Sequence, residues 1–184
     1  MLGFIRDETA NSMSFYPEQG TVSFGSKEVV ELTRLAKCEE GVARVSLHKS
    51  PRDPLHSMLV AQLAGRYWRP KRHLTKYKSF HIVEGVMLVI LFDNEGKILV
   101  SETLSFDDRR SVFVPAGTFH TNLAVSAVAV HHEVIEGPFK HGESDREAAW
   151  FAPPEGDTSA SRDYVSKLLA TRGLHSGRSE LTDS

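Results

Sequence analysis

The fold is decided by residues 65–85, which read GRYWRPKRHLTKYKSFHIVEG. This stretch contains a short apolar run from Phe80 to Val83, followed by Glu84-Gly85, a pair typical of the tight turns that join antiparallel strands. Similar runs, separated by turn residues, continue on both sides from about Arg44 to Ile135. The sequence therefore predicts an all-β domain of roughly six or more strands, built as a sandwich or barrel.

The regions on either side of these strands have different patterns. Residues 1–25 are rich in Gly, Ser and Asn without a sustained period, and they predict an irregular N-terminal arm. Ser26 suits a helix N-cap, and the apolar residues after it recur at three- and four-residue spacing, which predicts a helix over 26–42. The further predicted boundaries are 43–153 for the barrel, 154–172 for a C-terminal loop and helix, and 173–184 for a disordered tail.

The composition is that of one ordinary domain of 184 residues, of which 40% are hydrophobic and 25% charged. Lys and Arg total 22 against 24 Asp and Glu, which argues against a nucleic-acid-binding protein. No apolar run approaches the roughly 18–20 residues of a membrane-spanning helix, and the N-terminus lacks the features of a signal peptide. The single cysteine, Cys38, cannot form an intramolecular disulfide, so we expect a cytoplasmic protein.

Two spaced patterns indicate a particular kind of barrel. The stretch quoted above has the spacing of the first motif of the cupin proteins, in which a Gly precedes His-x-His, a Glu and a second Gly. Downstream, Pro115-Ala-Gly117-Thr-Phe-His120 has the Pro-x-Gly-x-x-His spacing of the second motif. The chain thus resembles the cupins. This resemblance implies a double-stranded β-helix, or jelly-roll, barrel, which the two predicted helices would flank, one on each side.

Beyond these motifs, the chain resembles the WbuC family of cupin-fold proteins over most of residues 43–157. That family is often associated with O-antigen and other surface-polysaccharide gene clusters, so the resemblance implies a role in surface-polysaccharide biosynthesis. The segments that carry it are Arg44 to His48, Asp53-Pro54, Arg69-Pro70, Ser79 to Gly85, Leu91 to Asp93, Pro115 to Thr121, Glu133 to Pro138 and Phe151 to Pro153.

The cupin motifs also imply a metal site made of three His and one Glu, and this chain retains only half of it. His73 and His120 stand at two ligand positions, whereas Lys71 replaces the first His and Lys78 replaces the Glu. A protonated lysine cannot ligate, and two ammonium groups repel a divalent cation. We therefore expect a degenerate centre, in which His73 and His120 bind Mn, Fe, Ni, Zn or Cu weakly or not at all.

The same residues allow a second interpretation. If Lys71 and Lys78 point into the barrel, they form, together with Arg69 and the two histidines, a cationic cluster that favours a small anionic or sugar-linked ligand. His48 and Phe80 are further candidates for contacts in this pocket. The alternative is that the lysine stems pack along the wall and their charged ends reach solvent, which leaves no ligand site.

The remaining histidines are weaker candidates. Strand alternation places His81 on the opposite face from Lys78, and at most one of the neighbours His131 and His132 can face inward. Lys78 would be a nucleophilic amine only if burial lowered its pKa.

Three classes of function remain. The leading prediction is a WbuC-like protein that binds a small anionic or saccharide ligand. The first alternative is an active metal-dependent enzyme of the sugar isomerase or oxygenase type, in which His73 and His120 gain additional ligands, so the sequence leaves open whether the protein is an enzyme. The second alternative is a structural or regulatory homodimer, because edge strands and the N-terminal arm offer pairing surfaces.

Overall fold

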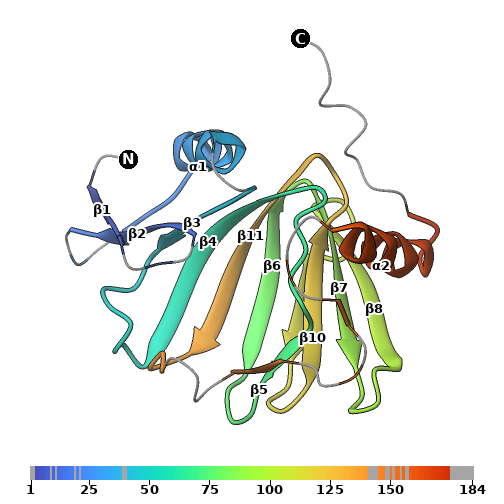
Figure 1. Ribbon diagram of the computed structural model, residues 1–184. Coiled ribbons are helices and arrows are strands. Elements are labelled where there is room, and N and C mark those ends of the chain that lie inside the picture. Colours follow the sequence, from blue (N-terminus) through green and yellow to red (C-terminus); the bar gives the residue numbers. More distant parts are fainter. Residues whose placement is uncertain are drawn as a thin grey trace.

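The computed structural model describes residues 3–8, 10, 12–18, 20, 22–38, 41–140, 145–147, 150, 152–153, 155 and 158–174. Within these residues the chain forms two β-sheets and two helices (Figure 1). The larger sheet consists, in spatial order, of β1 (Phe4–Arg6), β2 (Met13–Pro17), β3 (Val42–Ser46), β4 (Leu55–Leu63), β11 (Val128–Glu136), β6 (Lys78–Glu84) and β9 (Ser111–Val114). The smaller sheet consists of β12 (Asp145–Glu147), β5 (Lys71–His73), β10 (Phe119–Ala124), β7 (Val86–Phe92) and β8 (Ile98–Ser105). The helices are α1 (Ser26–Cys38) and α2 (Ser159–Ala170).

The inner faces of the two sheets enclose a shared apolar cluster. Phe80 and Ile82 of β6 pack with Met87, Val89 and Leu91 of β7, and all five side chains are buried. Alternate residues of a strand point to opposite faces, so the period-two pattern in the sequence fills this core. Neighbouring strands pair antiparallel, apart from the parallel pair β2 and β3. The predicted all-β architecture with two flanking helices is confirmed.

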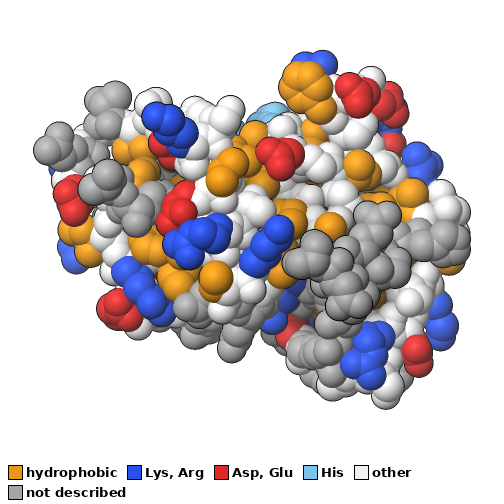
Figure 2. Space-filling view, turned by 90° about the horizontal axis from the view of Figure 1, so that it is seen from above, with side chains coloured by type: hydrophobic (Ala, Val, Ile, Leu, Met, Phe, Trp, Pro, Cys, Tyr) orange, Lys and Arg blue, Asp and Glu red, His pale blue; other side chains and the backbone are white. Residues whose placement is uncertain are grey.

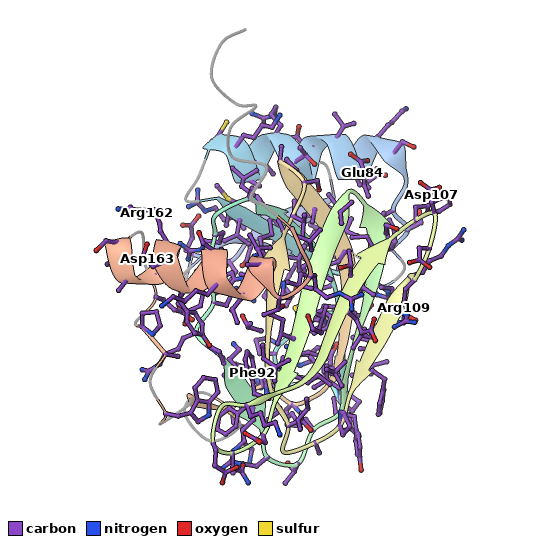
Figure 3. All side chains as sticks on the ribbon, turned by 90° about the vertical axis from the view of Figure 1, so that its right-hand side faces the viewer. Glu84, Phe92, Asp107, Arg109, Arg162 and Asp163 are labelled. Carbon is purple, nitrogen blue, oxygen red and sulfur yellow. The ribbon has the colours of Figure 1, made fainter. Side chains whose placement is uncertain are left out.

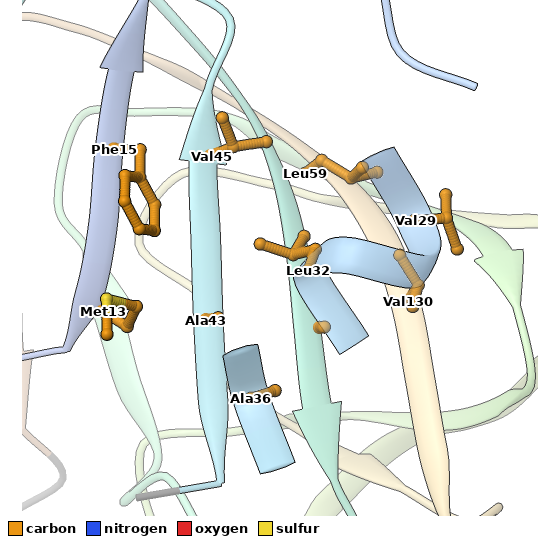
Figure 4. Packing of buried hydrophobic residues seen from close by; sticks show 10 residues of the cluster. Met13, Phe15, Val29, Leu32, Ala36, Ala43, Val45, Leu59 and Val130 are labelled. Carbon is orange, nitrogen blue, oxygen red and sulfur yellow. The ribbon is translucent and has the colours of Figure 1, made fainter. Parts of the chain in front are cut away.

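Helix α1 covers the outer face of the larger sheet (Figure 4). Val29, Leu32 and Ala36 recur at three- and four-residue spacing, so they lie on one side of the helix and are buried against the sheet. The helix is shorter than the predicted 26–42, because it ends at Cys38 and strand β3 begins at Val42.

Helix α2 lies across the outer face of the smaller sheet (Figure 3). Val165, Leu168 and Leu169 are buried there against β7 and β10, whereas Arg162 and Asp163, labelled in Figure 3, are exposed. In the part of the chain that the structure describes, neither α1, with 13 residues, nor α2, with 12, could span a membrane. The predicted disordered tail lies outside the described residues from position 175 onward.

The N-terminal region differs from the predicted irregular arm. It contains the strands β1 and β2, and β2 extends the larger sheet by pairing with β3. Met13 and Phe15 alternate along β2 and are buried in the cluster beneath α1. Two alternating apolar residues are too short a pattern to indicate a strand in sequence. Burial against α1 and pairing with β3 stabilise this one.

The packing of α1 predicts the effect of a truncation. Leu32 is fully buried, so Leu32→Ala removes apolar contacts and leaves a cavity, and we expect the free energy of unfolding to fall by about 2–5 kcal/mol. Val30 lies on the same helix but is 68% exposed, so Val30→Ala should change that free energy by about 0.5 kcal/mol or less. Urea denaturation measures both. Equal losses in the two variants would contradict this account of α1.

Candidate functional site

A cavity of about 110 Å³ lies between the two sheets. Both sheets contribute to its wall, as does the segment that leads into β5. The lining residues are Val42, Arg44, Met58, Val60, Trp68, Arg69, Lys71, Lys78, His120, Thr121, Asn122, His131 and Glu133.

Strand alternation and register bring the polar residues of this cavity together. On β11, His131 and Glu133 are two residues apart and share the inward face. Strand β6 lies beside β11 and directs Lys78 to the same side. In the smaller sheet, Lys71 of β5 pairs directly with His120 of β10. Four strands, two from each sheet, thus meet at one site.

The centre of the site is an ion pair between Lys78 and Glu133. The Lys78 Nζ atom lies 3.2 Å from the Glu133 Oε1 atom, and the two side chains are only 6% and 17% exposed. Burial raises the pKa of Glu133, but Lys78, His131 and Lys71 together outweigh burial and lower that pKa to about 2. Glu133 is therefore ionised at neutral pH and holds Lys78 as an ammonium. This pairing argues against Lys78 as a nucleophilic amine, because an ammonium has no lone pair.

His120 is a neutral imidazole in this site. Burial, reinforced by the nearby Lys78 ammonium, lowers the pKa of His120 to about 3. Its Nδ1 atom lies 3.0 Å from the Thr118 carbonyl oxygen, while its Nε2 atom is buried without a hydrogen-bond partner among the described residues. His131 is neutral as well, because burial lowers its pKa to about 4.

These residues do not fit the metal ion that the motifs imply. The His73 and His120 rings do lie together, with 5.7 Å between their centroids. In the part of the chain that the structure describes, however, no three His, Cys, Asp or Glu side chains are grouped so that they could hold a metal ion. Lys78 stands at the position of a ligand carboxylate, and it makes an ion pair with a carboxylate from another strand.

Of the other candidate residues, Arg69, Lys71 and Phe80 lie at this cavity, whereas His48 lies beside His56. Arg69 and Lys71 line the cavity with Lys78, as the anion-site interpretation requires. Phe80 packs beneath the site, with its ring 6.2 Å from that of His120. His48 does not line the cavity: its ring stacks on His56 at 4.2 Å.

The outward histidines follow the predicted alternation. His81 and His132 stack on each other with their ring centroids 5.6 Å apart, and His132 contacts the Ser57 hydroxyl at 2.7 Å. Neither lines the cavity, whereas His131 does.

Glu133 and Arg44 line the cavity but were not predicted from the sequence as residues of the site. The alternation of His131 and Glu133 on one strand was a usable signal, because an inward His131 requires an inward Glu133. No comparable signal identified the partner of Glu133, because the pairing of β11 with β6 joins segments about fifty residues apart. Arg44 was visible only as part of a predicted strand.

Comparisons with known proteins agree with this architecture. A family model described as a domain of unknown function (DUF6016) matches residues 37–104, which is less than half of the chain. No curated protein matches the sequence. Similar solved structures include CapF with the inhibitor 3-isopropenyl-tropolone, at a TM-score of 0.52 and 17% identity over 59% of this chain and 32% of that chain. CapF from Staphylococcus aureus, a capsular polysaccharide assembling protein, matches at 0.50 and 18% identity, over 57% of this chain and 28% of that one.

A third similar structure is protein SO0799 from Shewanella oneidensis, with a TM-score of 0.51 and 10% identity over 68% of this chain and 85% of that chain. At these identities the likeness concerns the fold, which is that of the cupin proteins. The chain spans about a third of the length of the CapF structures it matches.

The buried ion pair predicts a non-additive pattern of stability. Lys78→Met leaves a buried carboxylate without its cation, and we expect the free energy of unfolding to fall by about 3–5 kcal/mol. Adding Glu133→Leu removes the isolated charge and should return that free energy to within about 1 kcal/mol of the wild type. Chemical denaturation of the two single variants and the double variant measures this cycle. Additive losses would show that the two side chains are not coupled.

The lowered pKa of His131 predicts a pH dependence of stability. Between about pH 4 and 6.5 the unfolded chain binds a proton at His131 and the folded chain does not, so folding is favoured more as the pH rises. This contribution is complete above pH 6.5 and is lost as the pH falls toward 4. His131→Phe should therefore reduce the slope of the free energy of unfolding against pH by about 1.4 kcal/mol per pH unit in that window. Denaturation at a series of pH values tests this, and equal slopes for the two proteins would refute it.

Proposed function

We propose that this chain is a cupin-fold binding protein whose barrel takes up a small anionic ligand without the help of a metal ion. One observation carries the proposal. Four cationic side chains and a single carboxylate line the cavity, in a chain whose net charge is −2. A carboxylate or phosphate group is the natural partner of such a wall.

The distribution of charge supports this interpretation. On the face seen in Figure 2, basic and acidic side chains are interspersed. Inside the cavity, by contrast, Arg44, Arg69 and Lys71 accompany the Lys78–Glu133 pair, and His120 and His131 are neutral. Cations that line a partly enclosed cavity act on a ligand more strongly than cations on an open surface, because water screens them less.

The biological setting that we propose is surface-polysaccharide biosynthesis in the cytoplasm. It is supported by the resemblance to the WbuC family and by the fold shared with the capsular polysaccharide assembling protein CapF. The lone cysteine, Cys38, suits a reducing compartment. The ligand would then be a small charged sugar or a compound linked to one.

The proposal predicts that charge on the ligand decides binding. We expect D-glucuronate to bind and D-glucose, its neutral counterpart, to bind at least about tenfold more weakly, because charged hydrogen bonds contribute about 1.5–3 kcal/mol each. Lys71→Met should weaken glucuronate binding by a similar factor. Lys97→Met, at an exposed position outside the cavity, serves as the matched control and should change nothing. Isothermal titration calorimetry measures all four affinities.

Two results would overturn this proposal. One is equal affinity for the charged and the neutral sugar. The other is a Lys71→Met variant that binds glucuronate as the wild type does.

A further inference from the structure

We infer that the cavity selects carboxylates that also carry a hydroxyl group, such as sugar acids, over anions that lack one. This inference rests on the proposed anion-binding function and adds a second requirement to it. Positive charge at the wall explains why an anion binds, but it does not explain the uncharged acceptor that His120 places in the site.

The contact of His120 with the backbone determines which of its two ring nitrogens carries the proton. A carbonyl oxygen can only accept a hydrogen bond, so the Nδ1 atom, 3.0 Å from the Thr118 oxygen, carries the proton. A neutral imidazole has one proton, and the Nε2 atom is therefore an acceptor. This acceptor is buried, on a side chain that is 3% exposed, and it has no partner among the described residues.

The amide and hydroxyl side chains near this acceptor, Asn122 and Thr121 on the cavity wall and Gln62 behind Asn122, do not donate to it. The Asn122 Nδ2 atom donates to the Gln62 Oε1 atom at 2.8 Å, and the Gln62 Nε2 atom donates to the Arg66 carbonyl oxygen at 3.1 Å. The Thr121 hydroxyl donates to the Trp68 carbonyl oxygen at 2.7 Å. These groups bond to one another and to the backbone, so none of them donates to the His120 Nε2 atom, and a hydroxyl group of a ligand would supply the donor that this atom lacks.

A simple anion would not provide that donor. A buried acceptor that stays unmatched costs about 1–3 kcal/mol, and an anion brings only further acceptors toward His120 and the ionised Glu133. A hydroxyl group donates to such an acceptor while the carboxylate of the same molecule faces the cationic side chains. The ligand class that satisfies both parts of the site is a hydroxy acid.

The size and the apolar wall of the cavity narrow this class. A cavity of about 110 Å³ suits a short hydroxy acid or the carboxylate end of a sugar acid rather than an oligosaccharide. Val42, Met58 and Val60 line it on the side of β3 and β4, and they offer an apolar surface to the CH groups of such a ligand.

The test compares two carboxylates built on six-membered rings. D-glucuronate has ring hydroxyl groups, whereas cyclohexanecarboxylate carries the same charge and has none. We expect the wild type to bind glucuronate at least about tenfold more tightly by isothermal titration calorimetry, which corresponds to one satisfied buried acceptor. His120→Phe removes the acceptor and keeps an aromatic ring, so it should abolish this preference while cyclohexanecarboxylate still binds. His81→Phe, on the outer face of the sheet, is the control and should keep the preference.

The outcomes separate this inference from the function on which it rests. If both carboxylates bind the wild type equally, or if His120→Phe retains the preference, the hydroxyl requirement is wrong and the anion site stands. If neither carboxylate binds the wild type, both proposals fail. Retained binding of cyclohexanecarboxylate by the His120→Phe variant shows that the altered protein is folded.

Discussion

The ion pair of Lys78 and Glu133 is the interaction on which the site depends. A lysine ammonium buried between two sheets is costly without a partner, so Glu133 has to face inward at this level of the barrel. That requirement constrains the register of β11 against β6, because a slip of one residue would turn Glu133 outward and leave Lys78 alone. Register in turn determines which other side chains line the cavity, His131 among them.

The pair also changes the chemistry available to the barrel. Where the cupin motifs bring together ligands for a metal ion, this chain has a cation with its own counter-ion, and the adjacent imidazoles of His120 and His131 are neutral. Three further cationic side chains, Arg44, Arg69 and Lys71, line the wall beside this pair. The chain thus keeps the cupin fold. In our proposal the barrel recognises a charged and hydroxylated small molecule instead of carrying out metal chemistry.

Elements that depend on local sequence pattern could be predicted from the sequence, whereas those that depend on contacts between separate segments could not. Strands with several alternating residues and clear turns, such as the run from Phe80 to Val83, could be identified from local pattern, and so could both helices. Strand β2 could not, because its formation depends on the packing of Met13 and Phe15 against α1 and on pairing with β3. In the site, Lys71, Lys78 and His120 were found by motif spacing. Glu133 was missed, since its partner is set by strand pairing, and His48, predicted as a pocket contact, stacks on His56 and is not among the residues that line the cavity.

The central claim is that an internal ion pair stands where the related motif would hold a metal ion. The most direct measurement is elemental analysis of the full chain, purified without chelators or a metal-affinity step and then incubated with Mn, Fe, Ni, Zn or Cu, beside a His73→Ala/His120→Ala variant. Our account predicts that the two proteins retain the same substoichiometric background of every metal. One equivalent of a metal in the wild type that disappears in the variant would contradict it.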